Sequence, residues 1–133
     1  MMLAAGAGVE TTGNGIRAGF HSSPSPGVSN LTVPEGNTSF SDMIKDIKEG
    51  MIIDQVLGLG QGNVLSGVFS INVQLGFKIK NGKVAGRIKN VMIAGNAFQV
   101  LKDIVAVGSE ARWVSGQYHF PHVYVKSLSV STN

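Results

Sequence analysis

The dipeptide Asn81-Gly82 constrains the fold of this chain most strongly, because it joins two arms in which apolar and polar residues alternate. Asn-Gly is strongly favoured in two-residue type I′ turns, where both central residues need positive φ. We therefore expect a β-hairpin over residues 77–84. Its arms predict Ile79 and Val84 on the inward side, and Lys78, Lys80 and Lys83 near the rim.

Strand patterns continue on both sides of this hairpin. Residues 68–75 alternate between apolar and polar side chains, which predicts a strand with one buried and one solvated face. Residues 51–57, rich in Ile and Val, predict another strand, and residues 31–33 a short one. Downstream, residues 87–93 predict a strand that buries Ile88, Val91 and Ile93. Residues 118–130 predict one or two final strands, with Pro121 at an edge or a break.

Two short helices are expected. The first covers Asp42–Glu49, with Ser41 as its N-cap and Gly50 as the residue that ends it. The second covers Ala97–Ile104, with Asn96 as its N-cap and Gln99 at the capping-box position. Phe98, Leu101 and Val105 give the second helix an apolar stripe.

The predicted fold class is α+β: a β-rich, mostly antiparallel curved sheet or a partly open barrel with two short helices. About six or seven strands follow one another in hairpin order, which favours antiparallel pairing. The composition agrees, since the chain has eighteen glycines and only 14% charged residues. The sequence leaves the choice between sheet and barrel open.

Two regions differ in composition. Residues 1–40 form a glycine- and proline-rich irregular segment, and residues 41–133 hold the regular β-rich domain. Because the domain begins with an irregular segment, we expect the chain to be a fragment of a longer protein.

Reactive side chains are few. The chain has no Cys, which excludes disulfides, thiolate nucleophiles and Cys-ligated zinc within it. His119 and His122 are three residues apart on a predicted strand, which places them on opposite faces and makes them poor joint ligands. Neither they nor His21 belongs to a zinc-peptidase motif, and Glu49 and Asp54 lack the spacing of a shared site.

Other candidate motifs favour structural roles. Gly13-x-Gly15-x-x-Ala18 has the letters of a dinucleotide fingerprint, but His21 and Pro24 follow where a helix should begin. Gly58-x-Gly60-x-Gly62 lacks the Lys and Ser/Thr of a phosphate loop, and neither Ser66 nor Ser115 lies in a nucleophile elbow. Trp113 is more typical of a side chain buried in a core or an interface than of one on which a ligand stacks. The sequence therefore nominates no catalytic, cofactor-binding or metal-binding residue.

Charge and hydropathy limit the classes of partner that this chain is expected to bind. The net charge is +3, but the basic residues are spaced along the predicted hairpin, where they can form its solvated side, so nucleic acid is a disfavoured partner. The longest apolar run, residues 1–9, is too short to span a membrane and lacks the basic flank of a signal peptide. We expect a cytoplasmic protein without a membrane partner.

Several segments together resemble one family. They are TTGNGIRAG (11–19), PSPGVSNLTVPEG (24–36), IIDQVLG (52–58), the long block from SGVFSINV to DIVAVG (66–108) and PHVYVKSLSVS (121–131). These segments are similar to the C-terminal domain of the TldD/PmbA family, described as predicted metallopeptidases and as modulators of DNA gyrase.

The resemblance implies a peptidase system in which this chain is not the catalytic part. The family's His-Glu-x-x-x-His helix lies upstream of the matching region, and its Cys ligand would fall between Trp113 and His122, where this chain has none. The ending resembles the PmbA/TldE branch, whose members lack the metal ligands and pair with a catalytic subunit. Zinc or another divalent metal would then belong to the full-length assembly, and this chain would hold no cofactor.

The expected partners are a subunit of the same family, a second copy of this chain, or an extended peptide that adds a strand to a sheet edge. Two alternatives stay open from the residues alone. One is a stand-alone β-rich binding or interaction module unrelated to proteolysis, and the other is direct DNA binding.

Overall fold

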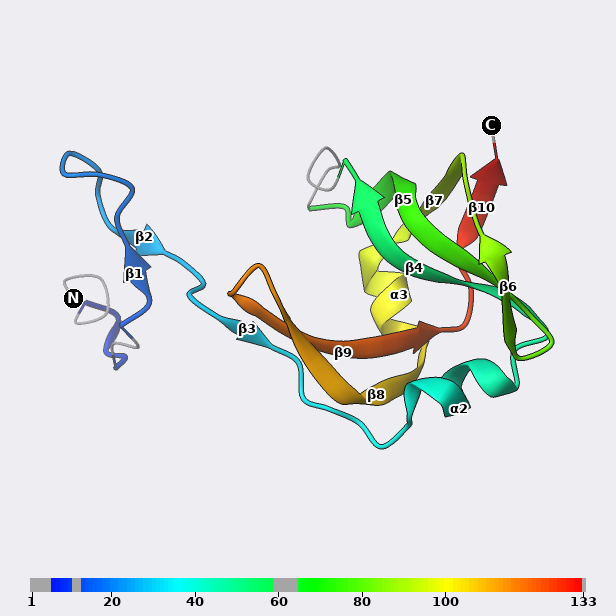
Figure 1. The fold of residues 1–133 in the computed structure, drawn as a ribbon. Coiled ribbons are helices and arrows are strands. Elements are labelled where there is room, and N and C mark those ends of the chain that lie inside the picture. Colours follow the sequence, from blue (N-terminus) through cyan, green and yellow to red (C-terminus); the bar gives the residue numbers. More distant parts are fainter. Residues whose placement is uncertain (1–5, 11–12, 59–64, 133) are drawn as a thin grey trace.

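The structure is a computed structural model that describes residues 6–10, 13–58 and 65–132. Figure 1 shows two curved layers of strands, with the first two strands in a segment that extends to one side. The elements are β1 (Gly15–Ile16), β2 (Ser25–Pro26), β3 (Leu31–Thr32), α2 (Phe40–Lys45), β4 (Glu49–Leu57), β5 (Val68–Lys80), β6 (Lys83–Arg87), β7 (Val91–Asn96), α3 (Ala97–Lys102), β8 (Ile104–Val114), β9 (Tyr118–Val125) and β10 (Ser129–Thr132).

Two sheets make up the body of the molecule. One has five strands in the order β10-β7-β5-β4, with β6 also paired to β5, and the other has three strands in the order β3-β9-β8. All strand pairs are antiparallel except the short β3–β9 pair. No sheet of the described residues closes into a barrel. The predicted α+β class is therefore confirmed, as a mostly antiparallel, open arrangement with two short helices.

The hairpin predicted from Asn81-Gly82 is present. Asn81 has φ 50° and Gly82 has φ 73°, as a type I′ turn requires, and Ile79 pairs with Val84 across it. Ile79 is only 1% exposed, as predicted, but Val84 is 51% exposed. The prediction for Val84 was wrong because β6 is a short edge strand whose residues are all exposed.

The apolar core lies on the five-stranded sheet. Val73, Val91 and Ile93 form its buried centre, and partly buried side chains surround them: Met51, Ile53, Val56, Ile71, Ile88 and Leu128. The predicted burial of Val91 and Ile93 is confirmed. The single strand expected over residues 87–93 is wrong, since β6 ends at Arg87, Asn90 has φ 53°, and β7 begins at Val91.

The first helix lies earlier than predicted. α2 spans Phe40–Lys45, and its N-cap is Ser39, whose Oγ accepts a hydrogen bond from the Asp42 backbone N–H at 3.1 Å. The helix ends at the C-cap Asp46, so the predicted cap Ser41 and the predicted end at Gly50 were wrong. Glu49 and Gly50 instead pair with Lys80 and Ile79 of β5, and this sheet pairing prevents the helix from continuing.

The second helix begins where predicted. The Asn96 side chain accepts hydrogen bonds from the backbone N–H groups of Phe98 (3.0 Å) and Gln99 (3.3 Å). Gln99 does not complete a capping box, because its amide donates to Asp103 Oδ2 at 3.0 Å. The helix ends at Lys102, and Ile104, predicted as helical, begins β8. Among the residues that the structure describes, no helix is both long and apolar enough to cross a membrane.

Candidate functional site

The two neighbouring histidines occupy opposite faces of β9, as predicted. The His119 ring lies against Trp113, with ring centroids 4.7 Å apart, and His122 lies against Phe40, with centroids 4.6 Å apart. Arg112 Nη2 and His122 Nε2 are 2.9 Å apart. Because arginine has no acceptor, Arg112 donates this bond and His122 Nε2 accepts it.

The carboxylates of Glu49 and Asp54, like the two histidines, do not form a shared site. Glu49 forms an ion pair with Lys78, with Oε1 and Nζ 2.8 Å apart. The hydrogen bond and the positive charge of Lys78 lower the pKa of Glu49 below its ordinary value. Asp54 lies at a register shift between Ile53 and Gln55 of β4. Among the residues that the structure describes, no three His, Cys, Asp or Glu side chains are grouped so that they could hold a metal ion.

The other motifs also fall on turns and short strands. Gly15 begins β1, and no helix follows it in residues 17–24, so the dinucleotide fingerprint has no phosphate-binding helix. Gly58 has φ 87°, whereas Gly60 and Gly62 lie outside the described residues. Ser115, with φ 52°, forms part of the turn between β8 and β9.

The tip of the β8–β9 hairpin carries exposed aromatic residues. Trp113 is 59% exposed and Tyr118 is 39% exposed. The Tyr118 and Phe120 rings stack with centroids 5.9 Å apart. Trp113 is therefore not a core anchor. Arg112, Phe120 and Phe40 were missed by the sequence analysis, although the density of aromatic and His residues in 112–122 was a usable signal.

A second exposed apolar surface surrounds α3. We call it the α3 patch, and its members are each more than half exposed: Val68, Phe98, Leu101 and Val105. Gly67 lies directly under it, since a Cβ built there would be 2.7 Å from the Phe98 ring. Phe98, Leu101 and Val105 were predicted as one stripe of the second helix, but Val105 lies in β8, so only Phe98 and Leu101 are on α3.

The total accessible surface is large for a chain of this mass. It is 10287 Å² for 13.9 kDa, whereas a compact monomer of that mass exposes roughly 6,700 Å². Part of the excess comes from the extended segment that carries β1 and β2 (Figure 1). The exposed apolar surfaces, rather than a cluster of reactive groups, are therefore the candidate functional site.

Comparison with known proteins agrees with the resemblance found in the sequence. A family model described as the PmbA/TldA metallopeptidase C-terminal domain matches residues 2–132. The chain belongs to the TldD/PmbA family. It is 33% identical over 105 residues to a metalloprotease of Methanothermobacter thermautotrophicus and 32% identical over 109 residues to a TldD homolog of Buchnera aphidicola. The two matches include 79% and 82% of this chain. They include only 23% and 22% of the length of these relatives.

Solved structures of TldD/PmbA relatives share the fold. TldE from Thermococcus kodakarensis matches 96% of the chain with a TM-score of 0.84 at 26% identity. A proposed modulator of a DNA gyrase from Thermotoga maritima matches 96% of the chain with a TM-score of 0.80 at 34% identity. The chain covers 29% and 28% of these two proteins.

Proposed function

We propose that this TldD/PmbA C-terminal domain is a docking platform in a peptidase assembly, that it binds another subunit of the family, and that it holds no catalytic metal of its own. The observation that carries the proposal is the α3 patch, whose members are each more than half exposed: Phe98 and Leu101 on the capped helix α3, Val68 on β5 and Val105 on β8. Contiguous exposed apolar patches of this kind mark protein-interaction sites.

The available area supports this role. One partner contributes roughly 800 Å² to a standard protein interface. The chain exposes 10287 Å², which exceeds the roughly 6,700 Å² of a compact monomer by several times that contribution. Part of this excess belongs to the extended segment with β1 and β2 (Figure 1), and the α3 patch and the aromatic hairpin tip are exposed surfaces of the domain body that an assembly can bury without disturbing the core.

The residues present do not fit a catalytic metal. His119 and His122 contact different aromatic rings on opposite faces of β9, and Glu49 is paired with Lys78. The chain has no Cys to add a thiolate ligand. The metalloprotease names belong to relatives of which the chain covers less than a quarter. We assign the hydrolytic chemistry of the assembly to a partner.

A binding experiment tests the docking role. The chain is mixed with a TldD-type subunit from the same organism, and complex formation is measured by light scattering coupled to size-exclusion chromatography. Leu101→Asp, in the α3 patch, should weaken the complex at least tenfold, about what a residue central to an interface contributes. Val84→Asp is the matched control, because Val84 is also exposed and apolar but lies on β6.

Two results would contradict the proposal. Full affinity of the Leu101→Asp chain would remove the α3 patch from the interface. Stoichiometric transition metal retained by the purified chain after dialysis against a chelator, measured by mass spectrometry, would contradict the non-catalytic role.

A second candidate function is the binding of an extended peptide. β4 pairs with β5 along one edge, and no strand of the described residues pairs with its other edge over Glu49–Leu57. Such an edge can accept a peptide as an added strand. Amide NMR signals of β4 should shift when unstructured peptides are titrated into the chain, and unmoved β4 signals would rule this role out.

A further inference from the structure

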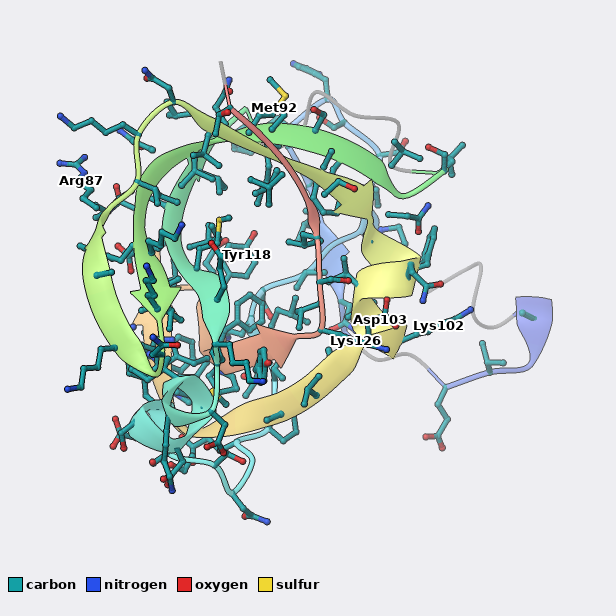
Figure 2. All side chains as sticks on the ribbon, turned by 90° about the vertical axis from the view of Figure 1, so that its right-hand side faces the viewer. Arg87, Met92, Lys102, Asp103, Tyr118 and Lys126 are labelled. Carbon is teal, nitrogen blue, oxygen red and sulfur yellow. The ribbon has the colours of Figure 1, made fainter. Side chains whose placement is uncertain are left out.

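A cavity of about 750 Å³ lies between the five-stranded sheet and the last part of β9 with the segment that follows it. Figure 2 looks into the interior around which the strands curve. Most of the side chains that line the cavity are apolar and come from β4, β7, β9 and β10 or the segments beside them: Ile47, Met51, Ile53, Ile88, Val91, Ile93, Val123, Val125, Leu128 and Val130.

The cavity is partly open to solvent, and its volume of about 750 Å³ lies within the roughly 300–1,000 Å³ that ligand pockets span. Val91 and Ile93 belong both to the buried core and to the cavity lining, so the cavity continues the core surface of the sheet. An occupant with an apolar body would complete a surface that the chain leaves partly uncovered.

The charged residues of the lining favour an anion. They are Glu49, Lys78 and Lys126, and the first two neutralise each other in their 2.8 Å ion pair. Lys126 forms no ion pair with any of the eight acidic residues, all of which the structure describes. The nearby Asp103 carboxylate accepts a hydrogen bond from Gln99, and its backbone C=O accepts one from the Lys126 N–H. Lys126 is exposed, so the lining carries one unpaired positive charge at its solvent side.

We propose that this cavity binds an amphipathic carboxylate with a long unbranched apolar chain. The tail lies on Val91, Ile93 and Val130, and the carboxylate forms an ion pair with Lys126. Burial of the tail supplies most of the affinity, and the charge pair fixes the orientation of the ligand. The site is independent of the α3 patch, so the docking experiment above does not decide it.

A fluorescent fatty acid provides the direct test. cis-Parinarate is titrated into the 133-residue chain, and saturable binding at one site per chain is expected. Val130→Trp should abolish this binding, because a large ring from β10 fills the cavity. Val130 is 45% exposed and therefore tolerates a larger side chain. Val123→Trp repeats the test from the opposite wall, and circular dichroism confirms that each variant is folded. No saturable binding, or binding that both variants leave unchanged, overturns the proposal.

The charge is tested separately. Lys126→Ala should weaken the binding of palmitate about fivefold, as expected for a partly exposed ion pair, and leave hexadecanol unaffected. Lys83→Ala is the control, since it removes the same charge from β6, outside the cavity. Equal competition by palmitate and hexadecanol, with no effect of Lys126→Ala, would show that no charge contact contributes to binding and would overturn the carboxylate assignment.

Discussion

The two main sheets of this molecule differ in how far they bury their apolar residues. The five-stranded sheet holds four of the five buried core residues, namely Val73, Ile79, Val91 and Ile93. The three-stranded sheet holds none of them, yet it exposes Leu31, Val105, Trp113, Val114, Tyr118 and Val123. Apolar content alone therefore does not decide burial. One sheet holds most of the buried core, and the other leaves many of its apolar side chains exposed.

Strand pairing explains the difference. β5 is paired on both sides, by β4 on one edge and by β7 and β6 on the other. β8 pairs with β9 alone, and its outer edge meets only a loop. There the Gly36 N–H donates to the Gly108 C=O at 2.8 Å and the Ala111 N–H donates to Glu35 Oε1 at 3.2 Å. With so few partners at its edges, this sheet buries its side chains less completely than the five-stranded sheet does.

The largest contrast should come from deleting side chains in each sheet. Ile93→Ala should lower the free energy of unfolding by about 2–5 kcal/mol, because it leaves a cavity in the core. Val114→Ala, at a residue that is 52% exposed, should change it by less than about 0.5 kcal/mol. Urea denaturation of both variants measures the contrast, and equal costs would show that the hairpin contributes to the core.

Gly82→Ala should be nearly as damaging to the five-stranded sheet. Its φ of 73° strains any other residue, and a Cβ would be 2.3 Å from the Lys45 carbonyl oxygen, which belongs to α2 backbone. A loss of about 2–4 kcal/mol is expected from strain and overpacking together. Gly116→Ala is the control in the other sheet, since φ is 69° but no atom lies within 4 Å. Gly116→Ala should lower the free energy of unfolding only through backbone strain, by about 1–2 kcal/mol.

Asn96→Ala tests the helix that connects the two sheets. The variant loses the acceptor for the Phe98 and Gln99 N–H groups and the 2.8 Å hydrogen bond that Asn96 donates to the Ser66 C=O. We expect a loss of about 1–2 kcal/mol, measured by thermal unfolding. Asn96→Ser should recover part of it, because serine also caps helices. An unchanged stability would mean that the cap is redundant.

Trp113, the only tryptophan, reports directly on the exposed sheet. Since it is 59% exposed, acrylamide should quench its fluorescence efficiently in the free chain. Binding of a family subunit at the hairpin tip should reduce the quenching several-fold. Quenching that is already weak in the free chain would place the indole against protein and remove the contrast between the sheets.

The smallest effect concerns the Glu49–Lys78 ion pair at the start of the five-stranded sheet. Folding lowers the pKa of Glu49, so its contribution is present above the unfolded pKa and is lost as the pH falls through the folded pKa. Glu49→Gln should therefore be slightly less stable than the parent chain at neutral pH. The difference should disappear in acid, when urea denaturation is compared at the two pH values. Because the pair is exposed, salt should weaken it as well.

Local features were predictable from the sequence. The Asn81-Gly82 turn and the Asn96 cap depend on the chemistry of a few adjacent residues, and both were found where expected. The end of α2 was not predictable in this way. Pairing of Glu49 with Lys80, thirty-one positions away, sets the start of β4 and overrides the helical pattern of residues 46–49.

The candidate site depended even more on distant contacts. The apolar stripe of α3 was visible in the sequence, but periodicity indicates only that an apolar face exists and not what covers it. The Phe40–His122 and Arg112–His122 contacts join segments whose proximity is fixed by the fold. The Arg112–His122 contact lies within one hairpin, where the aromatic and His residues of 112–122 gave a usable signal, whereas Phe40 comes from a distant helix that no local pattern places there.

The position of β5 among three partner strands also has a kinetic consequence. A hairpin closed by a two-residue turn forms in about 1–10 μs, so β5 and β6 should assemble first and serve as a template for β4 and β7. β10, which pairs only with β7, would then dock last. We expect changes in the turn to slow refolding, and changes in the final strand mainly to accelerate unfolding.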